Sequence, residues 1–198
     1  YVLNYAAGTV LRIVAAPSPF NLVAAAVSPS RIDLAWTAVP GAGAYEVDRR
    51  APGGAFQPLA TVAVPSYSDT TVQPNAAYLY RVRAVDAIGA SANSATELAT
   101  TVVFSDDPLV AGVVVRATHV AELRTAADAV RALAGLPGPA YTDAAAPGVI
   151  VRAVHIAELR AALDAARAAL QLPAASYTDP VLTGVPIKAA HIRELRDA

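Results

Sequence analysis

A seven-residue phrase that contains every histidine of the chain recurs three times at a fixed interval. The copies read THVAELR, VHIAELR and AHIRELR, and their histidines, His119, His155 and His191, are each 36 residues from the next. A fixed period of this size is typical of stacked supersecondary units, because one unit cannot bury its apolar face alone. The C-terminal half of the chain is therefore predicted to be an array of units that cover one another.

Each unit is predicted to be one helix and one loop. Alanine-rich stretches without proline follow the first two phrases, at 125–135 and 161–171, and Gly135, Pro137 and Pro173 are stop signals. Apolar residues three or four apart form one stripe on each helix. The stripes are Val120, Leu123, Ala127, Val130 and Leu133 in the first helix, and Ile156, Leu159, Leu163, Ala166 and Leu170 in the second. The third unit stops at Ala198 with its helix unfinished, so either the chain continues or a truncated helix caps the stack. An apolar stripe exposed on this helix would be a surface for another subunit to cover.

Residues 17–104 consist of short alternating runs with turn signals between them. Ile32, Leu34 and Trp36 fall on one face of the run 31–36, and Pro52-Gly53-Gly54 forms a turn. This pattern predicts an all-β sandwich.

The same region resembles a fibronectin type III domain. The matching residues are Trp36 on the second strand, Val72 and Pro74 before the sixth strand, the run YLYRVRA at 78–84, and Gly89 in the next loop. The resemblance implies that Trp36 is a core residue and that Tyr78 is the corner tyrosine, whose hydroxyl hydrogen-bonds to the backbone. It also implies a rigid spacer or binding module, a type of domain that is rarely catalytic.

Residues 1–16 contain two β-type runs, at 1–5 and 9–14, around Ala6-Ala7-Gly8. They predict a hairpin, and because a lone hairpin is marginally stable, its strands need a further partner. The first fourteen residues resemble the last propeller strands of soluble sugar and sorbosone dehydrogenases that use pyrroloquinoline quinone. Residues 105–198 resemble C-terminal repeat tails of secreted multidomain bacterial proteins, a likeness that carries no function with it.

Composition excludes several classes of function. The formal net charge is −1, so no basic surface for nucleic acid or an anionic membrane is predicted. Because the chain has no cysteine, it has no disulfide, thiolate zinc ligand or cysteine nucleophile. The longest uncharged runs, at 13–30 and 51–68, each contain three prolines, which do not suit a membrane-spanning helix.

The recurring phrase has a metal-binding and a structural interpretation. His and Glu three residues apart share a helix face, although two ligands per unit are too few for a tight zinc site without a further carboxylate. The candidate ligands are His119, Glu122, His155, Glu158, His191 and Glu194. In the structural interpretation the histidine bonds an exposed backbone group or loop near the helix start, and the glutamate lies in the first turn, at the positive helix end.

Arginines and loop aspartates extend the structural interpretation. Arg124 and Arg160 are predicted to reach the loop carboxylates Asp143 and Asp179, or carboxylates of an adjacent unit. Asp107 precedes Asp143 by the same 36 residues, as expected if every interface of a stack needs the same contacts. No Gly-x-Ser-x-Gly elbow and no phosphate-binding glycine loop occurs, so no catalytic residue is predicted.

The sequence thus predicts a multidomain β + α protein. It comprises donor or remnant strands at 1–16, a fibronectin type III (Ig-like) sandwich at 17–104, and a small all-α bundle of three 36-residue helical repeats at 105–198, the third truncated. We expect a secreted, non-enzymatic bacterial structural or adhesive protein of the cell surface, without a cofactor, that self-associates into a fibre or surface layer through strand and helix-repeat contacts. The expected partners are copies of the chain or another cell-surface protein, with a glycan as a further option and without nucleic acid or membrane insertion. The alternative is a C-terminal spacer or anchoring tail of a secreted propeller-type sugar dehydrogenase-like enzyme.

Overall fold

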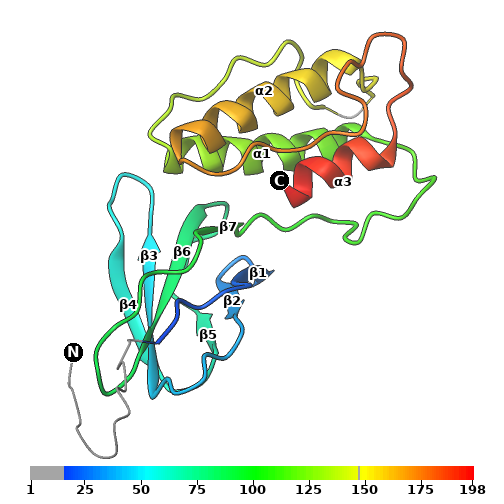
Figure 1. Cartoon of the computed structure of the whole chain (residues 1–198). Helices are drawn as coiled ribbons and strands as arrows, with labels where there is room; N and C mark the ends of the chain where they lie inside the picture. Colours follow the sequence, from blue (N-terminus) through cyan, green and yellow to red (C-terminus); the bar gives the residue numbers. More distant parts are fainter. Residues whose placement is uncertain (1–15, 147) are drawn as a thin grey trace, which may run out of the picture.

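The described part of the chain is a β-sandwich followed by three helices (Figure 1). The computed structural model describes residues 16–146 and 148–198. The strands are β1 (Val23–Ser28), β2 (Arg31–Ala35), β3 (Ala44–Arg50), β4 (Gln57–Val62), β5 (Ser66–Asp69), β6 (Ala77–Val85) and β7 (Glu97–Thr100). The helices are α1 (Ala117–Leu133), α2 (Ala153–Ala169) and α3 (Ala189–Asp197). The mixed β-plus-α fold class predicted from the sequence is confirmed.

The hairpin predicted for residues 1–16 lies outside the described residues, apart from Ala16. The backbone N–H of Ala16 donates to Oδ2 of Asp86 at 2.9 Å, which fixes the entry of the chain into the sandwich. The likeness of residues 1–14 to propeller strands also concerns residues outside the described part.

Two antiparallel sheets form the sandwich, with strand orders β1-β2-β5 and β4-β3-β6-β7. Ile32 and Leu34 of β2 and Val47 of β3 point into the space between the sheets, because side chains alternate between the two faces of a strand. Trp36 joins the same core and meets Tyr45 edge-on, with ring centroids 5.4 Å apart. The apolar residues that alternate in the sequence therefore form the inner face of the sandwich, as predicted.

The first half of strand β6 is buried on both faces and joins the sandwich to the helices. Tyr80 and Val82 belong to the core between the sheets, whereas Ala77 and Leu79 belong to the apolar core of the helices. The unbroken run of buried residues at 77–80 reflects this position, since a strand covered on both sides has no solvent-facing row, whereas Arg83 in the second half of β6 is exposed. One sheet of the sandwich thus serves as a wall of the helical core.

The helices begin within the recurring units, at Ala117, Ala153 and Ala189, 36 residues apart. The phrase itself therefore forms their first turns, ahead of the alanine-rich stretches predicted at 125–135 and 161–171. Helix α1 ends where Gly135 takes a φ of +72°, and α2 ends where Gln171 takes a φ of +59° in the same place. At both ends an N–H beyond the helix bonds back to a carbonyl five residues earlier, which satisfies a carbonyl the helix leaves free.

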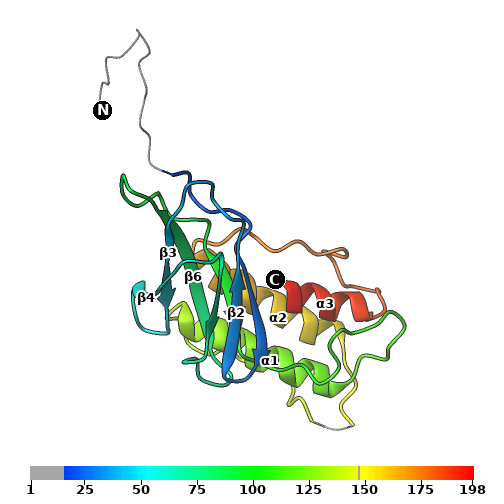
Figure 2. The same cartoon turned by 90° about the horizontal axis from the view of Figure 1, so that it is seen from below.

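The three helices run side by side in the same direction, as both views show (Figures 1 and 2). Arg124 of α1 lies 3.7 Å from Glu158 of α2, and further along, Arg131 donates to the carbonyl oxygen of Ala162 at 3.3 Å. The second contact lies closer to the C-terminal end than the first in both helices, so α1 and α2 are parallel. Parallel neighbours require the chain to return to the starting end after each helix.

The segments between the helices, at 134–152 and 170–188, are return segments, and each runs back along the helix that precedes it. After α2, the contacts in chain order are Arg167 to the carbonyl of Pro173 at 2.9 Å, Asp164 to the hydroxyl of Tyr177 at 2.8 Å, and Arg160 to the carbonyl of Asp179 at 2.5 Å. The contacts after α1 involve the residues 36 positions earlier. A return segment therefore lies in the groove between one helix and the next, which it also contacts.

Candidate functional site

The histidines of the phrase each hold a return segment against the start of a helix. In all three units the ring Nδ1 accepts the backbone N–H of the residue before the helix, at 3.0, 3.2 and 3.3 Å. The ring Nε2 faces an aspartate: Asp106 at 2.6 Å from His119, Asp143 at 2.8 Å from His155, and Asp179 at 2.9 Å from His191. The histidines are 4%, 2% and 0% exposed, so these are buried contacts.

This geometry fixes the tautomer of each histidine and engages both nitrogens of its ring. A nitrogen that accepts an N–H carries no proton, so Nδ1 is bare and the Nε2–H donates to the aspartate. The reciprocal bond from the residue before the helix to the third helical residue is the one that Glu or Gln makes in a capping box. Within residues 16–146 and 148–198, no three or more His, Asp or Glu side chains come together as a metal site.

The glutamates do not join the histidines, although the two share a helix face. Glu158 accepts hydrogen bonds from the backbone N–H of Thr142, at 3.0 Å, and from the Thr142 hydroxyl. Glu194 likewise accepts the backbone N–H of Thr178 at 3.0 Å. In the first unit Glu122 accepts the N–H of Ser105 at 3.1 Å. The prediction that these glutamates lie in the first helical turn is wrong. They lie one turn later, because each helix starts five residues before its glutamate.

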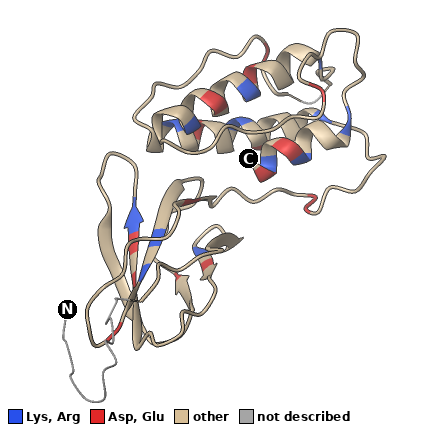
Figure 3. Cartoon of the chain, viewed as in Figure 1, with Lys and Arg blue, Asp and Glu red and all other residues tan. Residues whose placement is uncertain are grey.

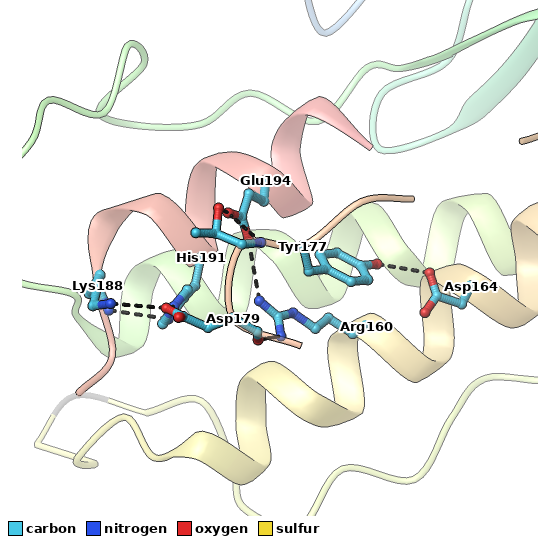
Figure 4. Close-up of polar contacts among 8 residues, drawn as sticks. Arg160, Asp164, Tyr177, Asp179, Lys188, His191 and Glu194 are labelled. Carbon is cyan, nitrogen blue, oxygen red and sulfur yellow. Dashed lines mark hydrogen bonds and ion pairs between the residues drawn. The ribbon is translucent and has the colours of Figure 1, made fainter. Parts of the chain in front are cut away.

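The loop aspartates before α2 and α3 bind the histidine and the basic residue at the start of the helix, as Figure 4 shows for Asp179, His191 and Lys188. Hydrogen bonds from His155 and Arg152 hold the pKa of Asp143 below its ordinary value. Hydrogen bonds from His191 and Lys188 do the same to the pKa of Asp179. These carboxylates are therefore charged anchors of the return segments.

Arg124 and Arg160 contact the loop aspartates through the backbone and not through the carboxylates. Each donates to the carbonyl oxygen of its aspartate, Arg124 to Asp143 and Arg160 to Asp179. The carboxylate that each arginine meets is instead the glutamate of the next helix, 3.3 Å away for Arg160 and Glu194. The reason is that the return segment presents its carboxylate to the histidine and its carbonyl to the arginine.

Aromatic rings of the return segments cover the same arginines. The guanidinium carbon of Arg124 lies 4.2 Å from the ring centroid of Tyr141, and that of Arg160 lies 4.3 Å from Tyr177. A guanidinium within about 6 Å of an aromatic face is attracted to it, and the interaction is stronger when water is excluded. Each arginine thus joins one helix, the adjoining return segment and the next helix.

The third arginine makes the corresponding contacts with the first unit, and in addition bonds the aspartate carboxylate, so that the contacts close a ring. Arg196 of α3 lies 4.3 Å from the ring centroid of Phe104 and 2.8 Å from Oδ1 of Asp106. Its Nη2 is 3.5 Å from Oε2 of Glu122 on α1. Contacts therefore run from α1 to α2, from α2 to α3, and from α3 back to α1. The segment that leaves the sandwich after β7 occupies the place of a return segment between α3 and α1.

Asp107 is not the counterpart of Asp143 and Asp179, although the 36-residue spacing predicted it. Asp106 binds both His119 and Arg196, and the hydrogen bond from Arg196 is the main cause that lowers the pKa of Asp106. One extra residue between the aspartate and the following glycine shifts the first unit out of the strict period. The motif aromatic, hydroxyl, aspartate, present as FSD at 104–106 and YTD at 141–143, is the signal that identifies the true equivalence.

The apolar stripe expected to be exposed on the third helix is covered. Ile192 is fully buried and Leu195 nearly so, as are the stripe residues of α1 and α2 that face them. The prediction of an exposed stripe is wrong because a helix in a closed ring has a neighbour on each side.

The two sandwich residues singled out by the sequence lie in its core. Trp36 is buried against Tyr45, and the hydroxyl of Tyr78 accepts the backbone N–H of Gln73 at 2.8 Å. A bond from the tyrosine to the backbone a few residues upstream is the contact made by a corner tyrosine.

A buried polar cluster in the sandwich has no signal in the sequence. Asp69 accepts hydrogen bonds from Arg49 at 2.7 Å, from Tyr80 at 2.9 Å and from the N–H of Thr71 at 2.9 Å. Burial alone would raise the pKa of Asp69, but these hydrogen bonds outweigh it, so the pKa lies below its ordinary value. The cluster joins β5, β3 and β6 across the two sheets.

Charged residues of both signs are interspersed over the helices and the strands (Figure 3). None of the described helices is long and apolar enough to cross a membrane.

The seven strands, their two sheets and the corner tyrosine together decide the class of the first domain. The sandwich has a fibronectin type III-like fold. Similar solved structures include an Fn3-like protein from Clostridium thermocellum, with 34% identity and a TM-score of 0.39 over 43% of this chain and 92% of that one. FN3tt shares 22% identity, with a TM-score of 0.41 over 44% and 96% of the two chains. The FN1–FN3 domains of chicken CNTN1 share 23% identity, with a TM-score of 0.39 over 43% and 33%.

No family model matches the chain, and no curated protein matches it. The structural matches above each span less than half of this chain. The likeness of the helical repeats to tails of secreted bacterial proteins, and the three domain boundaries, therefore stay predictions.

Proposed function

We propose that this chain is a non-enzymatic structural or adhesive module of a secreted bacterial protein, acting at the cell surface. Fibronectin type III-like domains are commonly extracellular structural or adhesion modules. The observation that carries the proposal is the use of the recurring phrase: its histidines, its glutamates and the arginine that ends each copy hold helices and return segments together. Because these side chains make internal contacts in every repeat, they support a structural role.

We further propose that copies of the chain associate through the outer edge of β1. Among the described residues, no strand pairs with that edge. It contains neither proline nor charge, and Val23 and Val27 are exposed beside it, whereas β4 at the edge of the other sheet carries Pro58. An edge without such protection favours pairing with a strand of another chain.

The outward-facing backbone groups of this edge follow from the hydrogen-bond pattern. The N–H of Trp36 donates to Pro65, so even-numbered residues along β2 direct their backbone toward β5 and odd-numbered residues toward β1. Their partners on β1 are Val23 and Ala25. The groups of Ala24 and Ala26 therefore point away from the sheet, where an added strand would bind.

Sedimentation velocity over a concentration series tests this assembly. The purified chain is expected to form larger species as concentration rises, and Ala24→Pro is expected to reduce them, because proline removes an outward N–H without breaking a β1–β2 bond. The matched control is Ser66→Pro, an outward position on the edge of β5, which should leave assembly unchanged. A chain that stays monomeric at high concentration, or one that assembles equally well with Ala24→Pro, contradicts the proposal.

A further inference from the structure

The segments that lead into the three helices carry the most exposed large aliphatic side chains of the described residues. These are Val110, Val114, Ile150 and Val181, which are 61%, 72%, 80% and 69% exposed. All three helices start at the same end, which projects beyond the sandwich in both views (Figures 1 and 2). The four side chains therefore lie at one end of the molecule, which we call the helix-start face.

The exposure follows the repeat. Val114 and Ile150 are 36 residues apart, and Pro186, also exposed, holds the same place in the third unit. The residues on either side of Val114, Val113 and Val115, pack against the helical core instead. Packing inside the chain therefore explains the inward residues of each segment but not the outward one. Exposed apolar side chains that cluster on one surface are typical of an interaction site.

A hollow of about 680 Å³ lies on this face, between the segment before α1 and the start of α3. Its aliphatic lining consists of Val113, Val114, Val115, Val151 and Ile187, beside alanines and a glycine. Among the described residues, the charged members of its lining are Lys188 and Arg193, both basic. The hollow thus offers apolar contact together with positive charge.

The basic charge of this face is in excess. Arg116 and Arg193 are exposed, and within residues 16–146 and 148–198 neither forms an ion pair with a carboxylate. Asp143 and Asp179 are each bound already by a histidine and a basic residue. Asp107 lines a cleft on the side of the sandwich instead. The three helices also direct the positive ends of their dipoles to this end. A second copy of the face would bring like charges together, whereas an acidic partner complements them.

We propose that the helix-start face binds an acidic segment of a partner protein. An apolar side chain of that segment enters the hollow, and its carboxylates pair with Lys188 and Arg193. A hollow of this size is within the range of about 300–1,000 Å³ that is usual for binding pockets. This site does not depend on the edge of β1, which belongs to the sandwich.

The test is a selection of random peptides of about twelve residues, displayed on phage, against the immobilised full chain. The enriched peptides are expected to carry two or more Asp or Glu residues around an aliphatic or aromatic residue. Fluorescence polarisation of the enriched peptide should then show affinity that falls as NaCl rises from about 50 to about 500 mM, because salt screens exposed charges.

Two variants locate the binding site, each with a matched control. Val114→Ser removes apolar lining and Arg193→Glu reverses a charge, and each should weaken binding by about tenfold or more. Both positions are exposed, so Tm should stay at the parent value. The same changes on the sandwich, Val64→Ser and Arg50→Glu, should leave the Kd unchanged.

The inference is overturned if no peptide is enriched, if the enriched peptides are not acidic, or if binding survives both Val114→Ser and Arg193→Glu. Two other results overturn it by assigning a different occupant. Vesicles of phosphatidylglycerol and phosphatidylcholine that bind the parent chain but not Val114→Ser would show that the face meets a lipid surface. Assembly in sedimentation velocity that is lost in Val114→Ser but kept in Ala24→Pro would show that a second copy covers it.

Discussion

His155 illustrates how the recurring phrase acts at the level of single atoms. Its Nδ1 accepts from the backbone of Arg152 and its Nε2–H donates to Asp143, so one buried ring satisfies the helix start and the return segment together. A metal ion would have to displace one of these bonds, and the glutamate on the same face is bound to Thr142.

His155→Ala is therefore expected to destabilise the chain whether or not metal is present. Removing the ring leaves the buried backbone N–H of Arg152 without its partner, which costs about 1–3 kcal/mol, and removes the hydrogen bond that ties Asp143 of the return segment to the helix start. Urea unfolding should show a loss of about 2 kcal/mol or more. Thermal unfolding of the parent chain with zinc or with a chelator should give the same Tm, and a metal-dependent rise in Tm that His155→Ala abolishes would contradict this role.

The loop aspartates predict a loss of stability in acid. The pKa of Asp143 and of Asp179 is lower in the folded chain than the ordinary value near 3.9, so the folded state favours their charged form. Their contribution is complete above the unfolded pKa and is lost as the pH falls through the folded pKa. Urea unfolding between pH 7 and pH 2 should show this decline, and Asp143→Asn with Asp179→Asn should flatten it. An unchanged pH profile in the double variant would show that the aspartates do not stabilise the fold through charge.

At the scale of the element, each return segment is fixed along its helix by an aromatic ring and a hydroxyl. Tyr177 supplies both, since its ring covers Arg160 and its hydroxyl bonds Asp164.

Two substitutions at Tyr177 separate these contributions. Tyr177→Phe keeps the ring and removes one hydrogen bond, so the free energy of unfolding should fall by about 1 kcal/mol. Tyr177→Ala also removes the ring and exposes the buried arginine, and should cost about 3 kcal/mol. Denaturant unfolding measures both, and equal losses would mean that the ring makes no contribution.

The elements differ in how much of them the sequence predicts. Local alternation is enough to place Ile32, Leu34 and Trp36 in the sandwich core, because strand periodicity depends only on neighbours in the chain. The apolar stripes of the helices can be predicted for the same reason. The partner of Arg196 is different: Asp106 lies 90 residues away, and the pairing exists only because three parallel helices close on themselves. The extra residue after Asp106 also hides its equivalence to Asp143 from a strict 36-residue alignment.

The whole molecule has its sandwich and its helices joined by shared apolar packing. Ala77 and Leu79 of β6 lie in the helical core, and the segment after β7 is held between α3 and α1. Thermal unfolding followed by the fluorescence of Trp36, the single tryptophan, should therefore coincide with the loss of helical circular dichroism. Two separate transitions in the parent chain would show that the two parts unfold independently.

The closed ring is tested most directly by the third arginine. Arg196 lies two residues from the end of the described chain, yet its side chain is only 5% exposed and contacts Phe104, Asp106 and Glu122. If the ring is closed, Arg196→Ala should lower the free energy of unfolding by about 2 kcal/mol or more, comparable with Arg160→Ala, because each leaves buried carboxylate oxygens without a partner. Arg193→Ala, on the exposed face of the same helix, should change it by less than about 0.5 kcal/mol. A loss at Arg196 no larger than that at Arg193, beside a large loss at Arg160, would mean that the helices form an open stack with a free end.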